Sequence, residues 1–253
     1  MSEREVIEQV AGFLRDAKSV VILTGAGIST ESGIPDFRGP QGVWTKDPEA
    51  ERRANIQYYM ANREARVASW KGRRNNAFAD ARPNAGHFAL AELERKGKLE
   101  LLVTQNIDSL HIQAGNSLER LIEIHGTVRD FMCMGCGERG PIERVLARVD
   151  AGEEDPPCRS CGGILKSATI SFGQSLVASD LERAGEAASN CDLFLAIGTS
   201  LGVYPAAYLP QYALQNGARL VIMNAQETPY DRYAAAILRG PIGEVLPEVV
   251  SLV

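Results

Sequence analysis

The sequence lacks the features that mark a membrane protein, a secreted protein or a general nucleic-acid binder. Its apolar runs fall short of the roughly 20 residues that a bilayer-spanning helix needs. The first five residues are mostly charged and hold no apolar stretch typical of a secretory signal. The 32 acidic residues outnumber the 27 basic ones, and the net charge of −5 gives no strong sign of direct nucleic-acid binding. We therefore expect a cytoplasmic protein without a membrane partner; for a eukaryotic chain a nuclear location is the alternative.

Cysteine and histidine are also scarce, with five and three residues in a chain of 253. Four cysteines form two Cys-x-x-Cys pairs, Cys133 with Cys136 and Cys158 with Cys161, and 21 residues separate the pairs. This spacing is close to that of a four-thiolate zinc ribbon, with redox dithiols and an iron–sulfur cluster as less favoured alternatives. Four thiolates leave no open coordination position, so we expect one structural Zn²⁺ that holds a small module at 128–166 together.

The glycine-rich stretch after the first apolar run is the central local signal. Residues 20–23 (Val-Val-Ile-Leu) continue into 24–27 (Thr-Gly-Ala-Gly), which is typical of a buried parallel strand entering a tight turn. Glycines there let the main chain approach a ligand, and free N–H groups at a helix start favour a phosphate. The signal is weak by itself, because Thr30 stands where the dinucleotide motif has a third glycine and a plain turn is the alternative. The continuation at 33–40 strengthens it by placing an acid, a phenylalanine and an arginine between residues that restrict the backbone.

Alternating helix and strand patterns predict an α/β fold with a parallel sheet. Apolar runs predict strands at 20–23, 99–104, 121–124, 192–197 and 220–223, and helical periodicity or position predicts helices at about 3–17, 85–96, 180–190, 205–213 and 243–253. Each strand ends in small or polar residues, and ligands of open parallel sheets bind beyond the carboxyl ends of the strands. We expect these ends to line one crevice. The charged segment 46–82 is interpreted as a solvated helical face or as a lid over a substrate pocket.

The motifs, taken in order, resemble those of the sirtuins, the NAD-dependent protein deacylases. The matching segments are 25–29 (GAGIS), 33–39 (GIPDFRG), 104–108 (TQNID), 125–126 (HG), the two cysteine pairs, 172–173 (FG), 198–201 (GTSL) with Val203 and Pro205, and Asn224. The resemblance implies a Rossmann-like NAD-binding domain at 1–127 and 167–253, with a helical lid insertion at about 46–82 and an inserted small zinc-ribbon domain at 128–166. It also implies a cleft in which NAD lies across the strand ends and an acylated lysine of a protein or peptide enters from the other side.

The resemblance also implies roles for individual residues. His125 is the general base, a task that its near-neutral pKa suits, and Asn106 and Asp108 complete the catalytic set. The alternative for Asn106 and Asp108 is a polar cap at a helix start. The cofactor-binding residues implied are Gly25, Ala26, Gly27, Thr30, Asp36, Phe37, Arg38, Trp44, Gln105, Asn106, Ile107, Asp108, Gly198, Thr199, Ser200, Asn224 and Ile242. The substrate-binding residues implied are His125, Ile170, Phe172, Gly173, Val203, Trp70 and Arg73. His87 and His111 are interpreted as structural.

The expected reaction is removal of an acyl group from lysine, with release of nicotinamide and O-acyl-ADP-ribose. Sirtuins that prefer acidic acyl groups carry a Tyr and, three residues later, an Arg. Trp70 and Arg73 align loosely with that pair, but the Tyr is lacking. Acetyl-lysine is therefore favoured, and longer acyl chains come second. Mono-ADP-ribosyl transfer or NAD hydrolysis on the same scaffold is the alternative activity. A non-catalytic NAD-sensing module is a further alternative, but it needs no base at His125.

Overall fold

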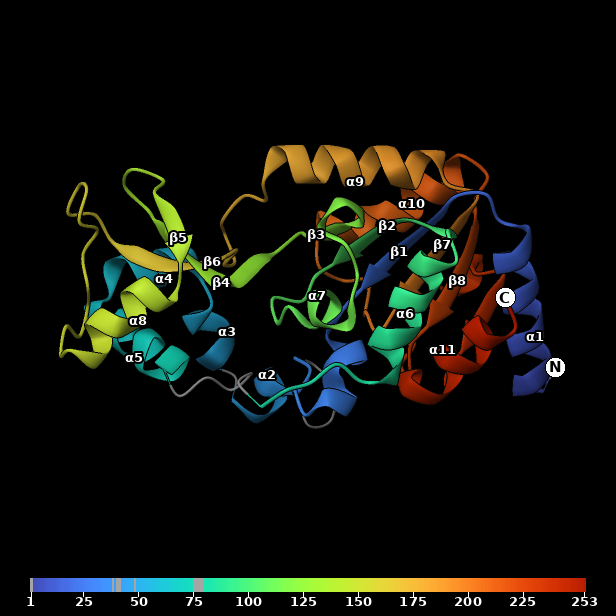
Figure 1. Ribbon diagram of the computed structural model, residues 1–253, viewed down its shortest axis with the longest axis horizontal. Helices are drawn as coiled ribbons and strands as arrows, with labels where there is room; N and C mark the ends of the chain where they lie inside the picture. The colour runs from blue at the N-terminus through green and yellow to red at the C-terminus, as the bar shows by residue number, and fades with distance from the viewer. Residues whose placement is uncertain (1, 38, 40–41, 48, 75–79) are drawn as a thin grey trace.

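A six-stranded parallel sheet forms the centre of the larger part of the molecule (Figure 1). The computed structural model describes residues 2–37, 39, 42–47, 49–74 and 80–253. The strands, in their order across the sheet, are β3 (Leu121–Glu123), β2 (Leu99–Thr104), β1 (Val20–Thr24), β7 (Leu193–Ile197), β8 (Arg219–Met223) and β9 (Ala236–Leu238). The chain builds outward from β1 on one side and restarts at β7 on the other, so the strand order reverses between them. This doubly wound order confirms the predicted Rossmann-like α/β fold class.

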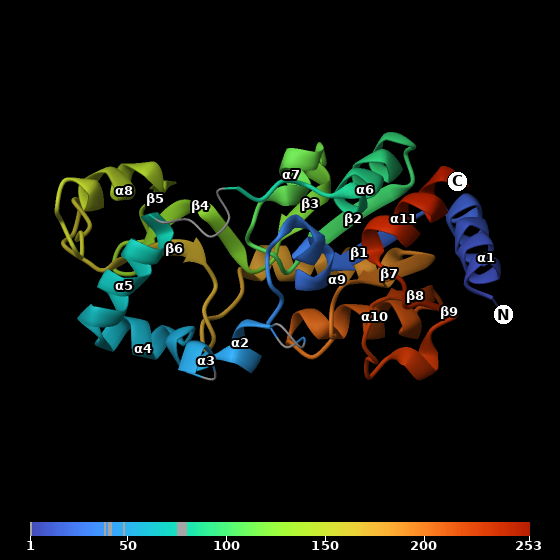
Figure 2. The same cartoon turned by 90° about the horizontal axis from the view of Figure 1, so that it is seen from below.

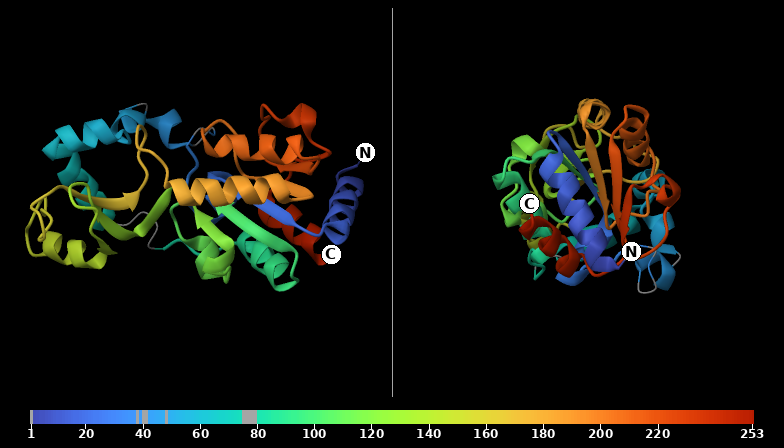
Figure 3. Two further views of the ribbon diagram at one scale, coloured as in Figure 1. Left: turned by 90° about the horizontal axis from the view of Figure 1, so that it is seen from above. Right: turned by 90° about the vertical axis from the view of Figure 1, so that its right-hand side faces the viewer.

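Helices cover both faces of the sheet (Figure 3). On one face lie α1 (Glu3–Asp16), α6 (Ala85–Arg95) and α11 (Ile242–Ser251), and on the other lie α9 (Ala178–Asn190) and α10 (Leu209–Gln215). Successive strand residues point to opposite faces, so Ile22 joins the first core and Leu23 the second. Burial on both faces explains why the strand residues form an uninterrupted apolar run.

Within the large sheet and the helices that cover it, two differences from the sequence prediction are clear. The strand β9 was not predicted, because three apolar residues without a strong turn signal do not stand out. The helix expected at 205–213 is divided into the 3₁₀ helix η3 (Ala206–Tyr208) and α10. Pro210 lies in the first turn of α10, where its missing N–H removes no helical hydrogen bond. Among the described helices, none is both long and apolar enough to cross a bilayer.

A three-stranded antiparallel sheet forms the smaller part of the molecule, at the left of Figure 1. Its order is β5 (Arg139–Pro141), β4 (Gly126–Cys133) and β6 (Leu165–Thr169), and α8 (Glu143–Asp150) follows β5. The remaining elements are η1 (Ala26–Ser32), η2 (Leu118–Arg120), η4 (Asp231–Tyr233), α2 (Val43–Lys46), α3 (Glu49–Arg53) and α7 (Leu110–Ala114). Because β4 begins at Gly126 and β6 ends at Thr169, this sheet extends beyond the predicted range 128–166.

Two further helices, α4 (Ile56–Ala61) and α5 (Arg63–Arg74), lie beside the small sheet (Figure 2). Trp70 of α5 is 1% exposed and belongs to the small hydrophobic core together with Phe131, Cys133, Ile142, Val145, Cys158 and Leu165. The Tyr59 hydroxyl donates to the Leu165 carbonyl oxygen at 2.8 Å. The sequence interpretation assigned the segment 46–82 to the large domain as a lid. Its helices α4 and α5 instead pack on the small sheet, whereas Ala81 packs with Ile34 and Leu110.

Arg66 connects α5 to the cysteine-bearing segment. Its Nε donates to Asp155 Oδ2 at 2.9 Å, and its Nη1 donates to the carbonyl oxygens of Tyr59 at 3.2 Å and Met60 at 3.0 Å. The side chains of Arg66 and Asp155 are only 11% and 16% exposed. Little water reaches this ion pair, so each charge depends on the other for its solvation.

Replacing Arg66 with alanine is expected to lower the free energy of unfolding by about 2–4 kcal/mol, because Asp155 loses its cation and two carbonyl groups lose a donor. The matched control is Arg63→Ala, which removes an ion pair to Glu154 whose side chains are 60% and 54% exposed. This change is expected to cost under about 1 kcal/mol, since exposed pairs contribute little. Urea unfolding of the two variants measures the difference, and equal losses would contradict the role given to Arg66.

Candidate active site

Two glycine-containing loops meet main chain to main chain at the carboxyl ends of β1 and β7. The Gly27 N–H donates to the Gly198 carbonyl oxygen at 2.8 Å, and the Gly25 N–H donates to the Ile197 carbonyl oxygen at 3.0 Å. A Cβ on Gly25 or Gly27 would lie 2.7 Å from an atom of Gly198, which is closer than real Cβ contacts come. Gly198 itself has φ +61°. Glycine is therefore needed at these positions so that the two loops can touch. The sequence interpretation had instead explained the glycines by the approach of a ligand.

A buried hydrogen-bond network joins η1 to the segment after β2. The Ser29 hydroxyl is fully buried and donates to Asp108 Oδ2 at 2.7 Å. Asn106 Nδ2 donates to Ser29 Oγ at 3.0 Å and to the Gly25 carbonyl oxygen at 3.2 Å, and Asp108 Oδ1 accepts from the Leu110 N–H at 2.9 Å. Burial raises the pKa of Asp108, and its hydrogen bonds from Leu110 and Ser29 oppose that rise. Both carboxylate oxygens and the Asn106 amide are therefore held in fixed orientations.

Two buried histidines lie behind this network. The Asn84 N–H donates to His87 Nδ1 at 3.3 Å, so the neutral ring carries its hydrogen on Nε2, which lies 3.4 Å from Ser29 Oγ. Burial lowers the pKa of His87 to about 4 and the pKa of His111 well below its usual value. The rings are 4.9 Å apart, and both are neutral near pH 7. This placement fits their interpretation as structural residues.

His125 lies just after β3, at the point where the chain leaves the large sheet. Its Nδ1 is 3.0 Å from the Gln105 carbonyl oxygen. A carbonyl oxygen only accepts, so Nδ1 carries the hydrogen and Nε2 keeps its lone pair. Burial lowers the pKa of His125, and the hydrogen bond to Gln105 partly offsets this. The resulting neutral imidazole is in the protonation state that a general base needs.

Gln105 connects the ends of four neighbouring strands. Its N–H donates to the Thr24 carbonyl oxygen at 2.9 Å, and its Nε2 donates to Thr199 Oγ1 at 2.8 Å. With the contact to His125, these bonds bring together residues that follow β1, β2, β3 and β7. The hydroxyl, amide and carboxylate groups collected here supply the donors and acceptors that ribose hydroxyls and a carboxamide require, so their chemistry fits NAD.

A cluster of three aromatic side chains lies where the segment after η1 meets the segment after β6. The Trp44 ring lies 5.0 Å from the Phe37 ring and 5.4 Å from the Phe172 ring, measured between centroids. The Phe172 N–H donates to the Ala54 carbonyl oxygen at 3.0 Å, and its own carbonyl oxygen accepts from the Ile56 N–H at 2.9 Å. Phe37 remains 46% exposed. The structure thus brings Phe37, Trp44 and Phe172 together.

The other predicted cofactor and substrate residues are more dispersed. Thr30 is exposed and donates to the Gly27 carbonyl oxygen, Asp36 accepts from the Gly39 N–H, and Asn224 donates to the Gln226 carbonyl oxygen. Ile242 is 8% exposed and packs in the core beneath the sheet. Ala26, Ile107, Ile170, Ser200 and Val203 are partly exposed, and Gly173 is exposed. Arg38 lies outside the described residues.

Trp70 and Arg73, the pair expected near the acyl group, differ in burial. Trp70 is buried in the small core, which argues against the expected contact with the acyl group. Arg73 is half-buried and lies within electrostatic range of Tyr59 and Lys166. Helical spacing alone did not indicate which side of α5 would face the core.

The four cysteines of the small domain converge on one point. The Sγ atoms of Cys133, Cys136, Cys158 and Cys161 all lie within 4.8 Å of one another. Tetrahedral zinc with Zn–S bonds of about 2.3 Å requires sulfur–sulfur distances of about 3.8 Å, and the pairs Cys133–Cys161 and Cys136–Cys158 are at 3.5 and 3.8 Å. The N–H groups of Gly135 and Gly163 donate to the Cys133 and Cys161 sulfurs, which favours thiolates. This donor set fits one structural Zn²⁺.

Comparison with known proteins identifies the family. The sequence profile of the Sir2 family matches residues 25–205. The chain belongs to the Sir2 family. It is 52% identical over 231 residues to NAD-dependent protein deacetylase 2 of Streptomyces coelicolor, covering 91% of this chain and 96% of that protein. It is 44% identical over 250 residues to NAD-dependent protein deacetylase 1 of Bradyrhizobium diazoefficiens, covering 98% and 96%.

Solved structures of Sir2 proteins share the whole fold. One, from work on the mechanism and regulation of Sir2 enzymes, has a TM-score of 0.88 at 39% identity and covers 98% of both chains. A complex described as Sir2 with a p53 peptide and NAD⁺ has a TM-score of 0.85 at 34% identity and covers 97% of both chains. The match includes the small domain, so both parts of this Sir2 chain have counterparts in those structures.

Sequence reasoning gave Ser29 no role of its own, although Ser29 is the centre of the buried network in this Sir2 chain. Its hydroxyl contacts Asp108, Asn106 and His87. The only available signal was its place at the end of the Gly-Ala-Gly-Ile-Ser run. Hydrophobic periodicity carries no information about a buried hydroxyl, so its partners became apparent only from the structure.

Removing the metal from this Sir2 protein with a chelator is expected to unfold the small domain and abolish activity, because the four converging thiolates repel one another once the ion that joins and neutralises them is gone. Trp70 lies in the same small core as Cys133 and Cys158, so its fluorescence should shift to longer wavelength as zinc leaves. A Trp44→Phe background isolates this signal, since the chain has two tryptophans.

The control for the zinc experiment is Cys191→Ser, which changes the buried fifth cysteine outside the cluster and should leave the zinc content unchanged. A metal-free preparation that is folded and active would contradict a structural role for the metal.

Proposed function

We infer that this protein is an NAD-dependent protein deacetylase that releases nicotinamide and O-acetyl-ADP-ribose. Relatives that carry this activity in their names match over nearly the whole chain. The structural observation that carries the inference is His125: its Nδ1 is fixed by Gln105 and its Nε2 retains a lone pair, in a region lined by the ends of several strands. A binding module has no need for such a base.

We propose specific roles for the residues around it. NAD, when bound, supplies the ribose carbon to which the acetyl oxygen bonds as the glycosidic bond to nicotinamide breaks. His125 Nε2 accepts a proton from a ribose hydroxyl, and the carbonyl of Gln105 stabilises the imidazolium that forms. Asn106 and Asp108 hold the ribose and the nicotinamide carboxamide, and the network through Ser29 keeps their side chains from rotating. Phe37 covers the reacting sugar carbon and limits access of water.

The acetylated peptide is proposed to bind as an extended strand between the Phe172–Gly173 segment and Val203. The N–H and carbonyl groups of Phe172 are already bonded to Ala54 and Ile56, so the peptide main chain pairs with Gly173 and its neighbours. Main-chain pairing selects little beyond the modified lysine itself, so we expect several substrate proteins. Acetyl is the preferred acyl group, and a cytoplasmic location stays a prediction.

The decisive assay follows NAD labelled in its adenosine part, which stays with ADP-ribose, in the presence of an acetylated peptide, the same peptide without the acetyl group, or no peptide. O-acetyl-ADP-ribose should form only with the acetylated peptide, and His125→Ala should lower turnover by about 10²–10⁴-fold, the usual contribution of a general base, while NAD binding persists. NAD consumption without acetylated peptide would instead indicate hydrolysis, and label transfer to protein would indicate ADP-ribosylation. Full turnover by His125→Ala would exclude it as the base.

The pH dependence should reveal the buried base. Burial lowers the pKa of His125 below its ordinary value of 6.5, so the proton-accepting form persists into more acidic solution. We expect kcat/KM to fall to half at a pH below 6.5 as the pH is lowered, and NMR titration of the His125 ring should give the same midpoint. His87 provides the internal reference, since its pKa is about 4. A midpoint above 7, or one that differs from the ring titration, would contradict the assignment.

A further inference from the structure

Three exposed tyrosines form a continuous row on the surface of the large domain. Tyr204, Tyr208 and Tyr212 are 55%, 42% and 37% exposed. The Tyr204 and Tyr208 ring centroids are 4.5 Å apart, and those of Tyr208 and Tyr212 are 6.4 Å apart. We call these residues the tyrosine row. Contiguous exposed aromatic surface of this kind marks sites of interaction, and tyrosine is among the residues that contribute most at interfaces.

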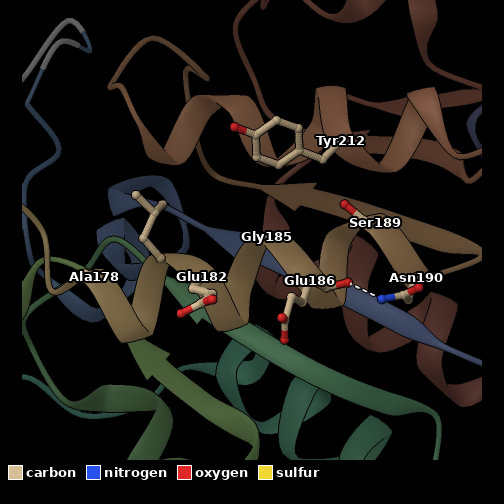
Figure 4. A pocket seen from close by; sticks show the side chains of 8 residues that line it. Ala178, Glu182, Gly185, Glu186, Ser189, Asn190 and Tyr212 are labelled. Atoms are coloured by element: carbon tan, nitrogen blue, oxygen red, sulfur yellow. Dashed lines mark hydrogen bonds between the residues drawn. The ribbon is translucent and has the colours of Figure 1, made fainter.

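The far end of the tyrosine row borders a groove between α9 and α10 (Figure 4). Leu181, Gly185, Ser189 and Tyr212 are among the residues that line it, and its volume is about 590 Å³. A Cβ on Gly185 would lie 3.8 Å from the Tyr212 ring, so the ring lies directly over the helix at its glycine. The groove is therefore shallow and has an aromatic wall.

The groove carries negative charge. Glu182 and Glu186 are among its lining residues, and no lysine or arginine is among the described residues that line it. Figure 4 shows both glutamates projecting from α9 on the side away from the Tyr212 ring. The faces of aromatic rings attract cations, and the carboxylates at the border of the groove attract cations as well. The surface is thus complementary to a positively charged, extended ligand.

The near end of the tyrosine row adjoins the proposed peptide site. Tyr204 directly follows Val203, which we assign to pairing with the acetylated peptide. The row has the length of roughly four extended residues. A substrate chain that leaves the cleft along this edge therefore passes over the tyrosines before it reaches the groove.

We propose that the tyrosine row and the acidic groove bind a lysine- and arginine-rich segment of the substrate protein adjacent in sequence to the acetylated lysine. This inference rests on the proposed deacetylase function and names the substrates that the site prefers. Some cationic side chains of the segment stack on the tyrosine rings, and others pair with the carboxylates of Glu182 and Glu186 at the border of the groove. A second copy of this chain fits less well, because a symmetric contact places these carboxylates close to one another. Nucleic acid fits less well because its phosphates would be repelled by the same carboxylates.

The experiment compares three acetylated peptides with the same central sequence: a short one, a long one with lysine and arginine at both ends, and a long one with glutamate in their place. For the unchanged protein, kcat/KM should be about tenfold higher on the basic than on the acidic long peptide, the combined effect expected of a few exposed cation–π and ionic contacts. The double variant Tyr208→Ala/Tyr212→Ala should lose most of this difference through KM, while kcat/KM on the short peptide stays unchanged.

Two further variants keep the test independent of folding. Glu182→Gln/Glu186→Gln leaves the rings in place and should also reduce the preference for the basic peptide. Phe88→Ala removes a 52% exposed aromatic from α6, on the opposite face of the sheet, and should leave the preference intact. Equal losses on short and long peptides, an undiminished preference in the tyrosine variant, or a dimer that this variant dissociates would each overturn the proposal. Absence of turnover on the short peptide by the unchanged protein would instead refute the deacetylase function.

Discussion

The close approach of two main-chain loops at the switch point of the sheet is the constraint on which the site depends. Gly25 and Gly27 after β1 pack directly on Gly198 after β7, with no space for a Cβ between them. The two hydrogen bonds across this contact fix where η1 begins. Because η1 carries Ser29, the loop contact also fixes the hydroxyl that organises Asn106 and Asp108. A local steric requirement thus sets the geometry of polar groups that lie several residues away.

The network around Ser29 illustrates how burial and charge are balanced at such a site. A carboxylate removed from water loses its solvation, and Asp108 regains part of it from Ser29 and from the Leu110 N–H. The neighbouring histidine, His87, is kept neutral by burial, so it supplies a hydrogen-bond donor without adding a positive charge. The same effect acts on His125, where loss of the proton is useful. Burial therefore gives the structural and the proposed catalytic imidazole the same protonation state for different purposes.

The sequence predicted the parts of this molecule that follow from local rules. Five strands were evident because each is an apolar run bounded by glycine or polar residues, and the cysteine spacing indicated the zinc ribbon. The strand β9 was missed because Ala236–Leu238 is too short to give a periodic signal. The partner of α5 was not predictable either, because helical spacing indicated neither that Trp70 faces a core nor which sheet α5 packs against. For Gly25 and Gly27, which follow β1, the residue type indicated a close approach of another group, but that group proved to be Gly198, which lies far away in the sequence.

The position of His125 links the two domains. Its ring is held by Gln105 of the large domain, while its carbonyl oxygen accepts from the Ile170 N–H at 2.7 Å, just beyond the strand that returns from the small domain. Gly126, the next residue, has φ +75° and packs against the Ala168 carbonyl, so the outgoing strand β4 and the returning strand β6 run antiparallel, side by side, with no side chain between them at this point. The ring is anchored on the large-domain side by Gln105, so the proposed base is held in a fixed relation to the ends of the parallel strands.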